Sequence, residues 1–221
     1  MRKILGLFTF GTTYLRFVRD PNRLDLVFKL ADSLDQDAPA THVMLAKPAV
    51  ASFLAGQAPP LRFELGALRA LPEGSLGRAF AVFLDQRGLD PTGLYHSGDV
   101  ALTDFERFRL HMERSHDLWH TVLGFDTDVA GELGLQAFTM AQLGSGLGYV
   151  ILSAAMLNTL FLNPEDGDRR MEAITRGWQL GRRMRPLFGA DWATMVTWPI
   201  EQVREHFGVG PADVHAAAMA A

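Results

Sequence analysis

Residues 105–123, FERFRLHMERSHDLWHTVL, decide the fold class, because large apolar side chains recur there with the spacing of an α-helix. With about 100° per residue, these side chains form one stripe: Phe105, Phe108, Met112, Trp119 and Leu123. Similar periodicity recurs along the chain, whereas no segment alternates with the period of two that marks a half-buried strand. The sequence therefore predicts an all-α fold.

The same periodicity gives the expected helix boundaries. Predicted helices span residues 22–34, 46–55, 75–87, 103–123, 129–162, 165–187 and Ile200–Phe207, after a helix at the N-terminus. Gly88, Gly124 and Gly189 follow predicted ends, where glycine commonly closes a helix. We expect a single compact multi-helix domain over residues 1–221, built around a long uncharged central helix, with its main internal break at residues 90–99 and a frayed tail at 216–221.

Composition limits the function classes. Hydrophobic residues make up 48% of the 221 residues and charged residues 21%, which is enough apolar surface for a core and excludes wholesale disorder. The net charge of −4 argues against a nucleic-acid partner, because such proteins concentrate positive charge to neutralise phosphates. Cysteine is absent from the sequence, so a bound metal would need nitrogen and oxygen ligands.

Two segments raise the question of a membrane. Residues 133–164 carry no formal charge and are long enough to cross a bilayer. Polar residues recur there every three or four positions, which favours a buried core helix over a transmembrane span. The N-terminal residues 1–20 place Arg2, Lys3 and Arg16 beside large apolar side chains. This pattern predicts either a buried helix or a segment that contacts an anionic membrane surface.

A cluster of histidine and carboxylate side chains is the main chemical signal. His116 and His120 are one helical turn apart, and Asp117 lies on nearly the same face. Two imidazoles at this spacing can bind one cation, as in helices of zinc enzymes. After a turn at residues 126–128, Glu132 lies where it can fold back over the histidines. The spacing alone is also compatible with histidines that have only a structural role. Burying the carboxylates of Asp117 and Glu132 without a partner is costly, however, and this favours a bound metal.

The motif also resembles that of a known family. His116-Asp117-x-x-His120, followed by eleven residues and Glu132, is similar to the HDxxHx₁₁E motif of the ubiquinone (coenzyme Q) biosynthesis protein 4 family. The wider stretch 114–143 resembles bacterial members, and the similarity extends over roughly residues 5–210. The resemblance implies an all-helical fold and one divalent metal held by His116, Asp117, His120 and Glu132. Zn²⁺, Fe²⁺ and Mn²⁺ suit these ligands, and Mg²⁺ is less suited to imidazole.

The resemblance also implies an activity and partners. The family removes the C1 carboxyl group of a polyprenylated hydroxybenzoate, with hydroxylation at that carbon, during ubiquinone biosynthesis. The expected protein is a metal-dependent carboxy-lyase of the 4-hydroxy-3-methoxy-5-polyprenylbenzoate decarboxylase type, in which the four metal ligands are the catalytic residues. Its expected partners are this prenyl lipid, other ubiquinone-biosynthesis enzymes and a membrane surface. Its expected location is the bacterial cytoplasm, on the inner face of the membrane.

Two other functions remain open at this point. The protein could bind prenyl lipids or act as a scaffold of the biosynthetic complex, with a structural metal. It could also be a metal phosphohydrolase that uses the His116–Asp117 doublet with His96 and Asp191. That third interpretation ranks last, because it leaves His120 and Glu132 without a task. The sequence does not decide whether the chain forms a homo-oligomer.

Overall fold

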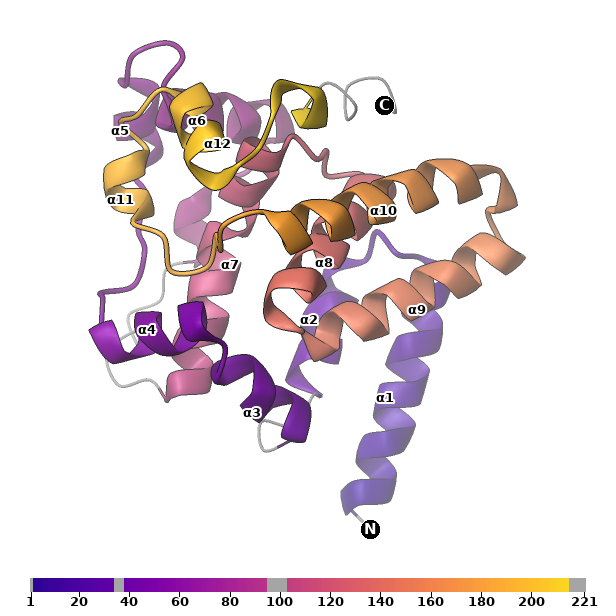
Figure 1. Cartoon of the computed structure of the whole chain (residues 1–221). Helices are drawn as coiled ribbons and strands as arrows, with labels where there is room; N and C mark the ends of the chain where they lie inside the picture. The colour runs from indigo at the N-terminus through magenta and orange to yellow at the C-terminus, as the bar shows by residue number, and fades with distance from the viewer. Residues whose placement is uncertain (1, 34–37, 95–102, 215–221) are drawn as a thin grey trace. The chain divides into compact units, whose positions relative to one another are not determined.

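The computed structural model describes residues 2–33, 38–94 and 103–214, and the regular elements in these ranges are all helices (Figure 1). One isolated β-bridge, between Ser75 and Pro199, joins two residues that lie between helices. The predicted all-α class is therefore confirmed. The helices divide into two compact units. The first contains the described parts of Met1–Met44 and Asp126–Arg182, and the second those of Leu45–Phe125 and Arg183–Met219.

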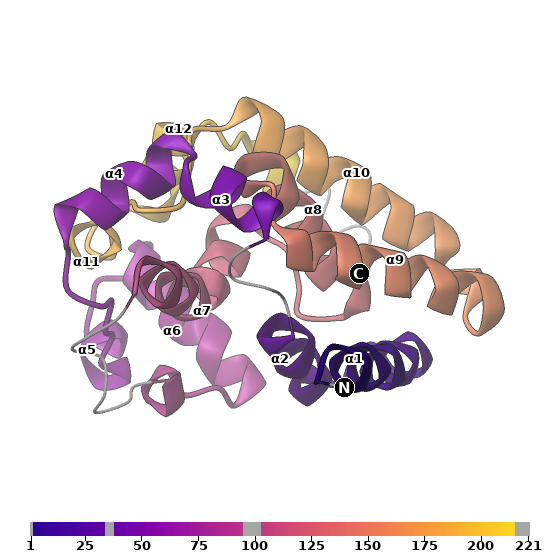
Figure 2. The same cartoon turned by 90° about the horizontal axis from the view of Figure 1, so that it is seen from below.

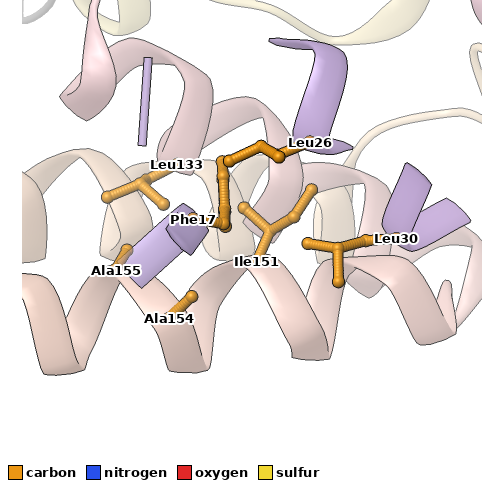
Figure 3. Packing of buried hydrophobic residues seen from close by; sticks show 7 residues of the cluster. All are labelled: Phe17, Leu26, Leu30, Leu133, Ile151, Ala154 and Ala155. Carbon is orange, nitrogen blue, oxygen red and sulfur yellow. The ribbon is translucent and has the colours of Figure 1, made fainter. Parts of the chain in front are cut away.

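The first unit is built around an apolar helix. Its elements are α1 (Arg2–Arg19), α2 (Leu24–Asp32), most of α3 (Pro39–Leu45), α8 (Val129–Leu143), α9 (Gly146–Phe161), η2 (Pro164–Asp166) and α10 (Gly167–Arg183). α9 packs against α1, α2 and α8, and Figure 2 shows α1 and α2 as neighbours. The buried side chains of this core come from four helices (Figure 3): Phe17, Leu26, Leu30, Leu133, Ile151, Ala154 and Ala155.

The second unit surrounds the helix that carries the histidines. Its elements are α4 (Pro48–Gly56), α5 (Leu65–Arg69), α6 (Leu76–Arg87), η1 (Pro91–Leu94), α7 (Asp104–Leu123), α11 (Trp192–Met195) and α12 (Ile200–Phe207). α7 packs against α4, α6 and α12. The buried side chains include Phe80, Leu84, Leu118, Trp119 and Trp192. The apolar side of α7 packs into this core, and polar side chains lie on the other faces of the helix.

The prediction of one long helix over 129–162 is wrong, because the uncharged stretch forms two helices. Gly144 ends α8 with φ of 72°, a left-handed conformation that interrupts a helix and that glycine adopts without strain. The hydroxyl of Ser145 then accepts a hydrogen bond from the Gly148 N–H at 3.4 Å and caps α9. Apolar periodicity continues through this break, so the local cap signal decides the structure.

Other boundaries differ in smaller ways. The helix predicted over 165–187 is preceded by η2 and ends at Arg183, so Gly189 is not its cap. The predicted break at residues 90–99 is not where the two units divide, and residues 95–99 and the tail 216–221 lie outside the described residues. The single domain over 1–221 stays a prediction. None of the described helices has the length and hydropathy that a membrane span requires.

Candidate metal centre

Three of the four predicted ligands lie together on α7. The rings of His116 and His120 have centroids 4.8 Å apart, and Nδ1 of His116 lies 3.2 Å from Oδ1 of Asp117. His120 is buried, whereas His116 and Asp117 are half-buried. The predicted grouping of these side chains on one helical face is therefore confirmed.

One ring nitrogen of His120 is held by a main-chain oxygen. Its Nδ1 lies 3.2 Å from the main-chain oxygen of Phe125, and a carbonyl oxygen can only accept a hydrogen bond. Nδ1 is therefore the donor of this hydrogen bond, and Nε2 is the ring nitrogen that can face a cation. Metal-binding histidines in proteins commonly have this arrangement, with one nitrogen donating to a carbonyl or carboxylate and the other facing the cation. The Asp117 carboxylate stands in the same relation to His116.

Both ends of α7 are fixed by local interactions. At the start, the Thr103 hydroxyl accepts a hydrogen bond from the Glu106 N–H, and the Glu106 carboxylate accepts one from the Thr103 N–H. At the end, Gly124 takes φ of 70° and donates its N–H to the His120 carbonyl at 2.8 Å. Because His120 lies in the last turn, the geometry of this end sets the position of its ring.

Glu132, the fourth predicted ligand, is held at the start of α8 in the first unit. The Asp128 side chain accepts a hydrogen bond from the Gly131 N–H at 2.8 Å, and its main-chain oxygen accepts one from the Glu132 N–H at 2.9 Å. A Cβ at position 131 would overlap the Asp126 carbonyl, so the close turn at 126–131 requires glycine there. The Asp128 carboxylate also pairs with Arg169 of α10.

These placements leave one part of the predicted site untested. His116, Asp117 and His120 belong to the second unit and Glu132 to the first, with five residues of chain between α7 and α8. The convergence of all four side chains on one cation therefore stays a prediction. The donor set itself, with two imidazoles and two carboxylates, fits a divalent ion that accepts nitrogen and oxygen ligands.

The structure gives a capping role to one of the two additional residues that the phosphohydrolase interpretation would need. Asp191 caps α11 by accepting a hydrogen bond from the Thr194 N–H at 3.2 Å. His96 lies outside the described residues. The pattern that would unite these two residues with the His116–Asp117 doublet therefore gains no support.

Two structural features near the histidines escaped the sequence reasoning. His111, five residues before His116 on α7, is buried and accepts a hydrogen bond at Nε2 from the Gly189 N–H at 3.1 Å. Burial lowers the pKa of its imidazole to about 4. Arg204 of α12 donates to main-chain oxygens at the end of α7. Neither contact has a local sequence signal, because each joins residues far apart in the chain.

Fold and candidate site together define an all-helical protein whose histidine-bearing helix is followed by a helix with a carboxylate near its start. Comparison with known families gives a specific assignment. Residues 7–213 match the family model described as coenzyme Q (ubiquinone) biosynthesis protein Coq4. The chain belongs to this family, as the motif predicts.

Individual relatives agree with this assignment. The chain is 27% identical over 188 residues to the mitochondrial ubiquinone biosynthesis protein coq4 of Aspergillus niger, covering 83% of this chain and 59% of that protein. It is 27% identical over 216 residues to the mitochondrial COQ4 homolog of Nematostella vectensis, covering 87% and 95%. The chain thus spans about three-fifths of the length of the Aspergillus relative.

A solved structure has the same fold. It is the crystal structure of a candidate ubiquinone biosynthesis protein from the bacterium Nostoc punctiforme, with a TM-score of 0.77 and 28% identity. The match covers 91% of this chain and 97% of that one. The family therefore has a bacterial structural relative beside its mitochondrial members, in agreement with the predicted resemblance to bacterial members.

Proposed function

We propose that the chain is a metal-dependent enzyme that removes the C1 carboxyl group of a polyprenylated hydroxybenzoate in ubiquinone biosynthesis. The observation that carries the proposal is the α7 geometry within a chain of this family. Two imidazoles lie one turn apart, and Nδ1 of each faces an oxygen that can accept a hydrogen bond from it. His116, Asp117, His120 and Glu132 are the proposed ligands of one Zn²⁺, Fe²⁺ or Mn²⁺ ion.

In this proposal one main-chain carbonyl and one side chain orient the two imidazoles. The Phe125 carbonyl holds the His120 ring through Nδ1, and Asp117 does the same for His116 through one carboxylate oxygen. The second oxygen of Asp117 is then the atom that can reach a cation. A bound divalent metal would supply a Lewis acid that draws electron density from the carboxylate or the ring. In the reaction the bond from C1 to the carboxyl carbon breaks, carbon dioxide leaves, and the electron pair that stays on C1 takes up a proton from water. Hydroxylation of that carbon in place of protonation would consume dioxygen as the oxidant.

Metal analysis combined with substrate turnover tests this proposal. We expect tag-free protein to hold close to one divalent metal per chain and to release labelled carbon dioxide from a carboxyl-labelled polyprenylated hydroxybenzoate. His116→Ala should lower metal affinity by about 10- to 100-fold or more, and Glu132→Gln should abolish turnover. His42→Ala, which removes an exposed histidine of α3, is the matched control and should change neither. Equal metal content in the His116 and His42 variants would contradict the ligand assignment.

A second candidate function is prenyl-lipid binding or scaffolding with a structural metal. The exposed apolar side chains of α9 favour it: Tyr149, Met156, Leu157, Leu160 and Phe161. Several large apolar side chains exposed on one helix are typical of a lipid or protein contact. This function predicts prenyl lipid in the purified protein without release of carbon dioxide. In the biosynthetic complex, other ubiquinone-biosynthesis enzymes would be the proteins that receive the lipid.

A membrane surface is the proposed source of the substrate. A polyprenyl chain is hydrophobic, so its benzoate must be taken from a bilayer. On α1, Phe8 is 70% exposed and Leu15 66% exposed, and both lie on the same helix as the exposed Arg16 and Arg19. Large apolar groups beside cations favour a peripheral contact with anionic lipid. The proposed location is therefore the inner face of the bacterial cytoplasmic membrane.

A further inference from the structure

Arg204 of α12 binds the end of the histidine-bearing helix. Its Nε donates to the Val122 carbonyl at 3.0 Å, and a terminal nitrogen donates to the Thr121 carbonyl at 3.2 Å. The other terminal nitrogen forms an ion pair with Glu201 at 2.7 Å. The side chain is only 13% exposed, so these hydrogen bonds are largely shielded from water.

The acceptors of Arg204 are groups that a helix cannot satisfy by itself. The last four carbonyl groups of an α-helix have no N–H partner within the helix, and a cation there is also favoured by the helix dipole. α7 ends at Leu123. The Gly124 N–H binds the His120 carbonyl, and the guanidinium binds the next two carbonyls along the chain. Three consecutive carbonyls of this turn are therefore fixed.

The same turn determines the orientation of His120. The chain passes from Val122 through Gly124 to Phe125, whose carbonyl accepts a hydrogen bond from Nδ1 of His120 at 3.2 Å. A shift of the end of α7 would move the Phe125 oxygen relative to the ring. The imidazole would then lose the hydrogen bond that keeps the proton on Nδ1.

We propose that Arg204 is a positioning residue for His120, acting through the last turn of α7. Arg204 fixes the Thr121 and Val122 carbonyls, and this keeps the Phe125 oxygen in place. Because that oxygen holds the Nδ1–H tautomer of His120, the lone pair of the ring stays on Nε2. The importance of this effect for metal binding rests on the function proposed above, whereas the effect on the ring itself does not.

Nuclear magnetic resonance of the metal-free protein tests the effect on the ring. Arg204→Met keeps the length of the side chain and removes its donors. We expect the ¹⁵N shifts of the His120 ring to indicate a dominant Nδ1–H tautomer in the wild type and a mixture of the two tautomers in the variant. The Gly124 amide should also exchange faster with solvent in the variant. Glu201→Gln removes the ion pair, leaves both carbonyl contacts, and should change neither signal. An unchanged His120 tautomer in folded Arg204→Met would overturn the inference.

Metal affinity is the second readout, with a control for general destabilisation. Val203→Ala weakens the packing of α12 through a fully buried side chain but leaves the guanidinium in place. We expect Arg204→Met to lower Zn²⁺ affinity by about 10- to 100-fold, and Val203→Ala to leave it within a few-fold of the wild type. Equal losses in the two variants would assign the effect to stability and overturn the inference.

A second substitution keeps the test decisive if Arg204→Met does not fold. Arg204→Lys retains the cation but replaces the planar fork, so it can reach only one carbonyl well. The His120 tautomer should shift in the same direction and by less, and an unshifted tautomer contradicts the role. If the wild-type protein binds no metal, the proposed function fails, while the tautomer measurement still decides the role of Arg204.

Discussion

His111 lies in the aromatic interior of the second unit. Its ring centroid is 4.2 Å from that of Phe53 and 4.7 Å from that of Phe188, and its Nε2 accepts the Gly189 N–H. A protonated ring could not accept this hydrogen bond and would bring a charge into an apolar environment. Burial therefore keeps the imidazole neutral, and its pKa falls to about 4 from the ordinary value of 6.5.

This shift predicts how stability depends on pH. Between pH 6.5 and 4 the unfolded chain binds a proton at His111 and the folded chain does not, so the free energy of unfolding falls as pH falls. The slope from this residue is about 1.4 kcal/mol per pH unit, or roughly 3 kcal/mol over the whole range. The stabilisation is fully present above pH 6.5. Urea unfolding at several pH values measures it.

The matched variant isolates His111 from the other groups that titrate. His111→Gln retains a hydrogen-bond acceptor for Gly189 and cannot take up a proton in this range. We expect the unfolding free energy of the wild type minus that of the variant to decrease as the pH falls from 6.5 to 4, because only the wild type loses stability through residue 111 in this range. A difference that stays constant with pH would mean that His111 titrates normally in the folded state.

At the scale of the helices, capping residues predict where several helices begin and end, whereas apolar periodicity does not predict the shortest helices or the division of a long apolar stretch. The helix at Ile200–Phe207 is predicted to the residue, and the ends near residues 75–87 and 103–123 differ only in whether the capping residue is counted. α5 and α11 are too short for their periodicity to stand out. The division at Gly144 was missed because the apolar pattern continues on both sides.

The candidate site follows the same rule. The grouping of His116, Asp117 and His120 was predictable because it depends only on the period of one helix. The contact of Arg204 with the end of α7 was not, because it joins positions 82 and 83 residues apart. Interactions over that sequence distance depend on how α12 packs against α7, which spacing does not encode.

Close packing of α10 against α8 gives a prediction at this scale. A Cβ added to Gly177 of α10 would overlap the main-chain oxygen of Gly134 in α8, so a larger side chain must separate the two helices. We expect Gly177→Ala to lower the free energy of unfolding by about 1–3 kcal/mol, despite the higher helix propensity of alanine. Urea unfolding followed by circular dichroism measures the change.

Gly11 of α1 provides the control for that substitution. It is also inside a helix, but no atom lies within 4 Å of the place where a Cβ would be added. Gly11→Ala should therefore leave stability unchanged or raise it by up to about 1 kcal/mol. If both variants gained stability, the close contact of α8 and α10 would not limit the size of residue 177.

At the scale of the whole molecule, the overall charge and the local surface point to different behaviour near a membrane. A net charge of −4 repels an anionic bilayer. An apolar contact with nearby cations can overcome this repulsion if it is localised, because the charge of distant groups is screened over about 10 Å at ordinary ionic strength. On α1 the exposed residue Leu15 lies within one helical turn of Arg16 and Arg19, and the exposed Phe8 lies about two turns earlier on the same helix. Phe17, in contrast, is buried in the core of the first unit.

This division of α1 determines how the membrane contact must be tested. Deleting residues 1–18 would remove Phe17 and damage the core, so a loss of binding would have two causes. The double substitution Phe8→Ser and Leu15→Ser changes only exposed positions. Full burial of such side chains in a membrane interface is worth roughly 1.5–3 kcal/mol each, so the double variant should bind anionic vesicles at least about tenfold more weakly in a flotation assay.

Val43→Ser on α3 is the matched control, because Val43 is 64% exposed and belongs to the same unit. It removes apolar surface away from the cations of α1 and should float like the wild type. High salt should reduce flotation of both the wild type and this control, since the arginine contribution is electrostatic. If the α1 double variant floats as well as Val43→Ser, α1 is not the membrane contact, and the substrate must enter from a surface such as the apolar face of α9.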